Sequence, residues 1–145
     1  MLYARKLEVS MRIVLLLTGL TMLGLSVAAQ NQAKEDPFHY LDKYDTEQKV
    51  TLTGKINKLD WTNPHVHIYL DVTDREGKVI AWSLEGYPPN TLKRTGLTSD
   101  LLPLGQTITV TAFRSKSGSN AAAASQIIFP DGSIRLAGPQ GPATQ

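Results

Sequence analysis

The sequence predicts an all-β fold with a minor helical part: a small closed barrel whose third and fourth strands are joined by a short helix. Apolar and polar residues alternate with period two in successive segments between positions 50 and 137, as half-buried strands do. The period changes near position 90, after the third such segment. Gly54 lies inside the first segment, where a closed sheet needs a bulge or a sharp coil.

The first three strands are predicted at residues 50–57, 66–72 and 78–85. A loop with Asn and Pro at positions 61–64 separates the first two strands. The turn at 74–77 closes with Gly, so the second and third strands form a hairpin.

Helical signals follow the third strand. Asn90 is a plausible N-cap for a short helix that runs to Arg94 and ends at Gly96. A further helical turn is predicted at 99–102. The remaining strands are predicted at 107–113, 121–129 and 133–137.

This order of elements is that of an OB-like barrel with five or six strands. The alternatives are an open β-sandwich and another kind of small β-barrel. Within the mature chain, polar residues 30–48 are interpreted as an N-terminal arm and 49–137 as the barrel domain. Residues 138–145, with Gly and Pro but no periodicity, are interpreted as a flexible tail.

Residues 1–29 are interpreted as a secretory signal peptide. An apolar stretch at 13–27 follows a positively charged start, and small residues precede Gln30, the expected first mature residue. The stretch is shorter than the roughly 20 residues that span a bilayer, so cleavage is favoured over an uncleaved anchor. Translation could begin at Met1 or at Met11. We expect a periplasmic or secreted protein without a stable membrane span after cleavage.

Cleavage would remove the excess of positive charge. The whole chain holds 15 Lys and Arg residues, 13 Asp and Glu residues and no Cys. Three of the basic residues and one of the acidic residues lie in 1–29, so 12 of each remain and the mature chain is neutral. A neutral exported domain lacks the electrostatic footprint of a nucleic-acid binder. The lack of Cys excludes a disulfide framework, a thiolate zinc site and a Cys nucleophile.

The motifs of the barrel carry a family resemblance. Trp61-Thr62-Asn63-Pro64-His65, followed by the hairpin and by Pro130-Asp131-Gly132, resembles a family of small exported bacterial proteins of unknown function. The resemblance covers essentially residues 48–137. It implies export and a small β-rich domain, and no established activity. Such proteins often begin the mature chain with His-His-Ser-Phe, whereas this chain has Phe38-His39-Tyr40 in roughly that region.

The best candidate site lies on the second strand and the loop before it. Residues two apart in a strand share a face, so His65, His67 and Tyr69 point away from the apolar residues with which they alternate. That face and that loop form the usual ligand surface of OB-type barrels. The predicted ligand-binding residues are Trp61, Asn63, His65, His67, Tyr69 and Glu85.

Each of these residues also has a purely structural interpretation. The polar side chains could form an exposed sheet face, with His65 hydrogen-bonded to the preceding loop, and Trp61 could plug one end of the barrel. Glu85 could pair with His65 or His67 across the hairpin mouth and raise the pKa of the imidazole. It could equally be an exposed carboxylate at a strand end.

His65 and His67 also admit a metal hypothesis. Two imidazoles about 6–7 Å apart along a strand can bind one Zn²⁺ or Cu²⁺ ion, and a useful site needs at least a third ligand. No cofactor is otherwise expected. The candidate third ligands, none with diagnostic spacing, are His39, Asp60, Asp71 and Glu85.

The sequence favours a binding module over an enzyme. It has no Gly-rich phosphate loop, no Gly-x-Ser-x-Gly elbow and no His-Glu-x-x-His pattern, and three His residues offer little acid–base chemistry at pH 7. We expect an exported module that binds a small molecule or an envelope protein. A copper- or zinc-binding protein is the alternative, and a hydrolytic or transferase enzyme is the least favoured.

Overall fold

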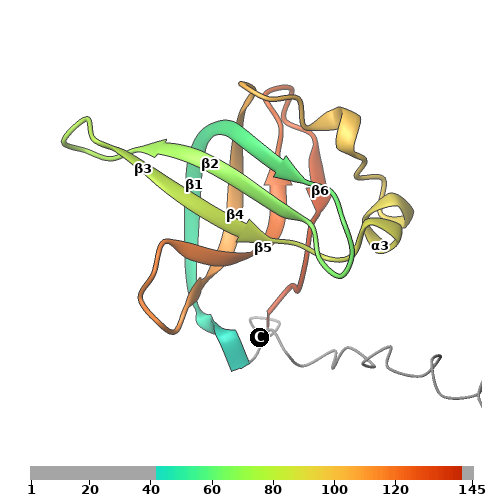
Figure 1. Ribbon diagram of the computed structural model, residues 1–145, viewed down its shortest axis with the longest axis horizontal. Coiled ribbons are helices and arrows are strands. Elements are labelled where there is room, and N and C mark those ends of the chain that lie inside the picture. The colour runs from blue at the N-terminus through green and yellow to red at the C-terminus, as the bar shows by residue number, and fades with distance from the viewer. Residues whose placement is uncertain (1–41, 142–145) are drawn as a thin grey trace, which may run out of the picture. The chain divides into compact units, whose positions relative to one another are not determined.

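A computed structural model describes residues 42–141, which fold as a β-barrel with short helical segments (Figure 1). The six strands form one sheet in the order β3-β2-β1-β4-β5-β6. The elements are β1 (Tyr44–Asp60), β2 (His67–Thr73), β3 (Val79–Glu85), α3 (Pro89–Arg94), the 3₁₀ turn η1 (Ser99–Leu101), β4 (Thr107–Ser115), β5 (Ala121–Ile128) and β6 (Ile134–Leu136).

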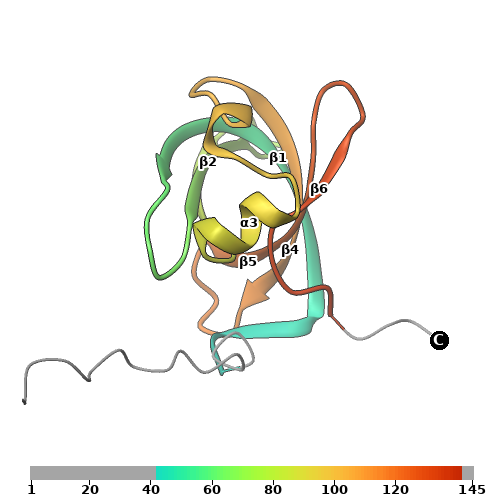
Figure 2. The same ribbon diagram turned by 90° about the vertical axis from the view of Figure 1, so that its right-hand side faces the viewer.

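Parallel pairing between β3 and β5 closes the sheet into a ring, while the other pairings are antiparallel. The closed circuit β1-β2-β3-β5-β4 confirms the predicted OB-like barrel, with β6 added outside the ring on β5. Viewed along the barrel, α3 lies across its opening (Figure 2). The all-β prediction with a short helix between strands three and four is therefore correct, and the open sandwich does not form.

β1 is long because it pairs with two neighbours in succession. Its first part pairs with β4 and its last part with β2, so the strand has to coil sharply between them. The register shift lies between Ile56 and Lys58, two residues beyond the glycine. Gly54 instead permits a close approach of β2, because a Cβ there would lie 2.5 Å from the carbonyl oxygen of Asp71.

β1 begins at Tyr44, six residues before the predicted start. Residues 44–48, which the sequence places in an N-terminal arm, are therefore the first part of a barrel strand. The alternation is missing there because Tyr44 is the only buried residue among them. The remainder of the predicted arm, up to position 41, lies outside the described residues.

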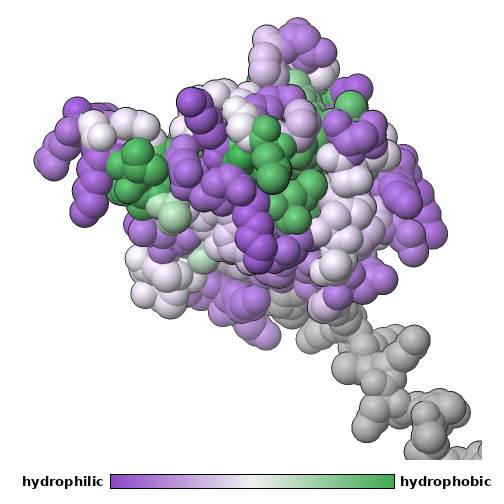
Figure 3. Space-filling view, turned by 45° about the horizontal axis from the view of Figure 1, so that its top comes forward, coloured by the Kyte–Doolittle hydropathy of each residue, from purple (hydrophilic) through white to green (hydrophobic). Residues whose placement is uncertain are grey.

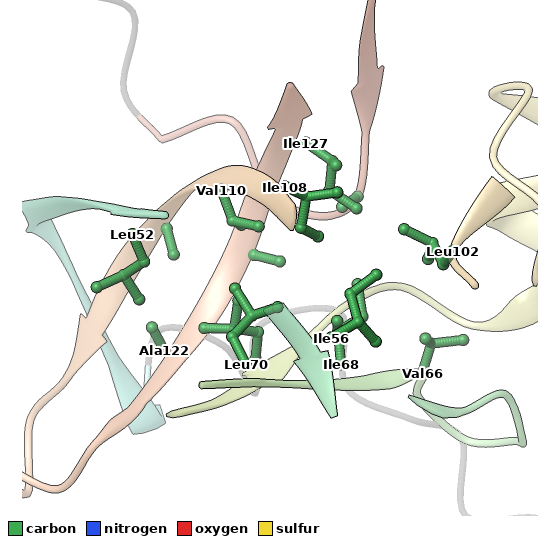
Figure 4. Packing of buried hydrophobic residues seen from close by; sticks show 14 of the residues in the cluster. Leu52, Ile56, Val66, Ile68, Leu70, Leu102, Ile108, Val110, Ala122 and Ile127 are labelled. Carbon is green, nitrogen blue, oxygen red and sulfur yellow. The ribbon is translucent and has the colours of Figure 1, made fainter. Parts of the chain in front are cut away.

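Alternate residues of the strands fill the barrel interior (Figure 4). The apolar set predicted to face inward in the second strand is confirmed, because Val66, Ile68 and Leu70 are each at most 1 % exposed. Large side chains from the other elements complete this core: Ile56, Leu84, Leu92, Leu97, Leu102, Ile108, Val110 and Ile127.

The alanines of β5 suit its position between two strands. Ala122 and Ala124 face the main core, whereas Ala123 packs on the opposite face in a small cluster with Tyr44 and Phe113. The small side chain of Ala123 leaves room on the outer face for the rings of Tyr44 and Phe113. The outer cluster thus fastens the beginning of the described chain onto the barrel wall.

Two predicted ends are corrected by the structure. α3 begins at Pro89 and its N-cap position is Pro88, so Asn90 lies inside the helix. No side chain caps the N-terminus of α3.

Residues 138–141, predicted as part of a flexible tail, pack against β5. Gly138 is buried, and the Gln140 side-chain amide donates to the Ser125 carbonyl at 3.2 Å. Residues 142–145 lie outside the described part.

The described surface is mainly hydrophilic, and its exposed apolar side chains are scattered. In the view of Figure 3, apolar atoms form separate patches among hydrophilic ones. The large apolar side chains that stay exposed are Val79, Leu101, Leu104, Ile134 and Leu136.

The close approach at Gly54 yields a test of the fold. We expect Gly54→Ala to lower the free energy of unfolding by about 1–3 kcal/mol, the usual cost of overpacking, because its Cβ would press on the Asp71 carbonyl. Urea unfolding measures the change. Lys55→Ala, at an exposed position of the same strand, is the control. Equal stability of Gly54→Ala and the wild type would contradict this account of β1.

Candidate functional site

A buried carboxylate marks the end of β3. Glu85 is 2 % exposed and stands in the sheet between His67 of β2 and Ala123 of β5. Burial of a carboxylate is costly unless charged or hydrogen-bonding partners replace the lost water. The partners of Glu85 therefore show what holds this end of the barrel together.

Three side chains surround the Glu85 carboxylate. Oε2 accepts a hydrogen bond from the Tyr44 hydroxyl at 2.6 Å and pairs with Lys43 Nζ at 2.9 Å. Oε1 lies 3.2 Å from His65 Nδ1. We call Lys43, Tyr44, His65 and Glu85 the Glu85 cluster. It joins the start of β1, the loop before β2 and the end of β3.

The chemical state of Tyr44 follows from this contact. Burial, the hydrogen bond to Glu85 and the negative charge of that carboxylate, in decreasing order, raise the pKa of Tyr44 well above its usual value. The phenol therefore stays a neutral hydrogen-bond donor throughout the physiological pH range. The Lys43 side chain, in contrast, is 56 % exposed, so water screens its ion pair with Glu85.

Beside the Glu85 cluster lies an open polar hollow of about 470 Å³. It is bounded by the start of β1, the end of β3 and the β4–β5 loop, and Figure 1 shows that loop beside the start of β1. The backbone N–H of Lys116 donates to the Lys43 carbonyl at 3.0 Å and ties these walls together. The lining residues are Asp42, Lys43, Tyr44, His67, Ser83, Glu85, Ser115, Lys116, Ser117, Ser119 and Ala121.

The β4–β5 loop presents a chain of hydroxyl groups to this hollow. Ser115 Oγ and Ser117 Oγ are 2.8 Å apart, and Ser117 Oγ and Ser119 Oγ are 2.9 Å apart. The backbone N–H groups of Ser117 and Ser119 also donate to the preceding hydroxyls in this series. The loop is thus held by its own side chains, and all three serines are among the residues that line the hollow.

The predicted polar face of β2 continues from the hollow over the outside of the sheet. The rings of His67 and Tyr69 are stacked with centroids 6.4 Å apart. Lys58 Nζ lies 4.8 Å from the Tyr69 ring centroid and 2.9 Å from Asp60 Oδ2. The hydrogen bond from Lys58 lowers the pKa of Asp60, with smaller contributions from Tyr69 and His67. Two cross-strand rows result, Lys58–Tyr69–Ser83 and Asp60–His67–Glu85.

The structure divides the residues predicted to line one groove. His67 and Glu85 line the hollow, and Tyr69 stacks on His67 next to it. His65 lies against Glu85 with only 11 % of its side chain exposed. This pairing is one of the two placements considered for that carboxylate. Trp61 packs partly buried against the barrel core, as its structural interpretation has it. Asn63 stays exposed in the loop before β2.

The metal hypothesis finds no third ligand within the described chain. No three His, Cys, Asp or Glu side chains converge as a metal site requires among residues 42–141. His65 is engaged with Glu85 and His67 faces the hollow. His39, one of the candidate ligands, lies outside the described residues.

Sequence reasoning missed Lys43, Tyr44 and the serines of the β4–β5 loop. The sequence could have pointed to the serines, because a polar loop between the fourth and fifth strands belongs to the ligand surface of OB-type barrels. No sequence pattern points to Lys43 and Tyr44, because their contacts with Glu85 span more than forty residues of sequence.

The sequence matches the model of one protein family. Residues 24–124 match a protein family described as a family of unknown function, DUF6152. No curated protein and no solved structure matches the chain. Among the helices of the described residues, none has the length and apolar character to cross a membrane.

The Glu85 cluster predicts a graded loss of stability on substitution. Glu85→Ala should cost roughly 3 kcal/mol, because it leaves buried donors without their acceptor. Tyr44→Phe should cost about 1.5 kcal/mol, the range for one hydrogen bond to a charged group. Lys43→Ala should cost less than about 1 kcal/mol, since that ion pair is exposed. Urea unfolding of the three variants tests this order, and a Lys43→Ala loss as large as that of Glu85→Ala would contradict it.

The raised pKa of Tyr44 predicts a loss of stability at high pH. An unfolded tyrosine ionises near its ordinary pKa of about 10, whereas folded Tyr44 stays neutral to a higher pH. Its contribution is therefore complete below pH 10 and declines as the pH rises above that value. Between pH 10 and pH 11 the wild type should lose about 1 kcal/mol more than Tyr44→Phe. Urea unfolding at each pH measures this difference. If the free energy of unfolding changed with pH equally in the wild type and in Tyr44→Phe, the raised pKa of Tyr44 would be disproved.

Proposed function

The chain belongs to the DUF6152 family of unknown function, and we propose that it is an exported binding module that holds a small polar ligand in the hollow beside Glu85. One observation carries the proposal: a buried carboxylate fixes the start of β1 against the barrel and so builds a polar hollow in advance of any ligand. Sites prepared in this way bind without the cost of reorganisation.

Binding is favoured over catalysis by the state of the groups in the hollow. The Glu85 carboxylate already holds Lys43, Tyr44 and His65, and the pKa of Tyr44 is raised far from neutral pH. A general acid or base works best with a pKa near the working pH. The cluster is therefore suited to positioning the walls of the hollow and poorly suited to proton transfer.

Export is the second part of the proposal. It is supported by residues 1–29, where a positively charged start, an apolar stretch and small residues follow one another as in a secretory signal. The ligand would then be one present in the periplasm or outside the cell.

The test is to find a retained ligand and to displace it by filling the hollow. Native mass spectrometry of protein purified from its own cell envelope should show a bound small molecule. Ser83→Phe should abolish that added mass, because position 83 lines the hollow. Ala81→Phe is the matched control, since it lies two residues earlier on the same face of β3 and is exposed outside the hollow.

Two results would contradict the proposal. One is a wild-type protein that carries no added mass in repeated gentle preparations. The other is an added mass that Ser83→Phe retains as fully as Ala81→Phe does. Equal urea-unfolding midpoints of the two variants would establish that a loss of ligand does not reflect unfolding.

A further inference from the structure

We infer that the ligand of the hollow is an uncharged saccharide, held by the serine hydroxyls of the β4–β5 loop and of β3 beside the His67–Tyr69 ring pair. This inference rests on the proposed binding function and names the ligand class of that same site. Three properties of the described residues carry it: the balance of charge, the number of hydroxyl groups and the adjacent rings.

The charges around the hollow cancel. Its lining holds two cations, Lys43 and Lys116, and two carboxylates, Asp42 and Glu85. Lys43 Nζ is already paired with Glu85 at 2.9 Å. A site for an anion gathers cations and backbone donors without carboxylates, and a site for a cation does the reverse. This hollow offers neither kind of ligand a net attraction.

Hydroxyl groups are the commonest functional group of the lining. Four serines contribute them, from two strands and one loop: Ser83, Ser115, Ser117 and Ser119. A hydroxyl can donate one hydrogen bond and accept two, and Ser119 Oγ stands at the end of the hydrogen-bonded series, 2.9 Å from Ser117 Oγ. Groups that both donate and accept match a ligand whose own hydroxyls do the same. Sugars are the common biological ligands of this kind.

The sheet surface next to the serines supplies an aromatic ring, that of His67. His67 lines the hollow and its ring stacks with that of Tyr69, which Lys58 Nζ also approaches at 4.8 Å, while Tyr69 stands directly opposite Ser83 in the β2–β3 pairing. Rings combine a large apolar area with a polar tip, and the C–H faces of a pyranose can pack on such an area. A hydroxyl-rich wall and a ring surface therefore meet at Ser83.

A nucleic acid is the main competing ligand for an OB-like surface. Binding its backbone needs a net positive groove that neutralises several phosphates. The mature sequence is neutral and the hollow contains as many carboxylates as ammonium groups. The equal number of carboxylates and ammonium groups also disfavours a free phosphate or a sulfated glycan as the ligand.

The experiment titrates natively processed, ¹⁵N-labelled protein with defined sugars and follows its backbone amides by NMR. The uncharged probes are cellobiose, maltose and di-N-acetylchitobiose; the charged probes are glucosamine, glucuronic acid and inorganic phosphate. At least one uncharged probe should shift the amides of residues 83 and 115–119 saturably. Its Kd should change less than about twofold between about 20 and about 300 mM NaCl, because the interaction involves no net charge.

Matched variants locate the binding. Ser83→Phe should weaken the sugar at least about tenfold, and Ser119→Ala should weaken it several-fold through the lost hydroxyl. Ala81→Phe and Ser133→Ala, in the β5–β6 turn outside the hollow, should leave Kd unchanged. Saturable shifts away from the hollow, or binding by the charged probes alone, would overturn the inference.

Failure of this inference is distinguishable from failure of the binding function. A retained molecule that is not a carbohydrate, lost in Ser83→Phe, would leave the binding module intact and disprove the sugar. Absence of any response to all uncharged probes would also count against the saccharide. Only the absence of any retained molecule in the native preparation would contradict both the saccharide inference and the proposed binding function.

Discussion

A buried carboxylate needs charged or hydrogen-bonding partners, and this need organises the end of the barrel that carries the hollow. Glu85 sits at the end of β3, where the ring of strands closes, and only 2 % of it is exposed. Because an unpaired buried carboxylate is unstable, the chain must bring hydrogen-bond donors to it from elsewhere. Tyr44 begins β1, Lys43 directly precedes that strand, and His65 comes from the loop before β2. A single charge thus determines where three separate segments meet.

The geometry of the hollow follows from that meeting. Tyr44 packs with Phe113 and Ala123 on the outer face of the sheet, so the start of β1 is held by apolar contacts as well as by Glu85. The β4–β5 loop then lies against it through the backbone bond from Lys116 to Lys43. The polar lining is consequently a by-product of closing the barrel.

The barrel itself was predictable from sequence, whereas the Glu85 cluster was only partly so. Alternation in β2 identified its inward face, and glycines and prolines marked most strand ends. The first residues of β1 escaped notice because only Tyr44 among them is buried, so no period appears. The pairing of Glu85 with His65 was one of two open alternatives, since a strand-end glutamate has the same sequence pattern whether it is exposed or buried. Choosing between them requires knowing what lies across the sheet.

The parallel pairing of β3 with β5 determines when the barrel can close during synthesis of the chain. The ring closes through Ala121, Ala122 and Ala123, which stand late in the sequence, so no nascent chain can complete it until most of the polypeptide has left the ribosome. Pairings between distant segments also form slowly. An incomplete chain therefore stays open until β5 is available to pair with β3.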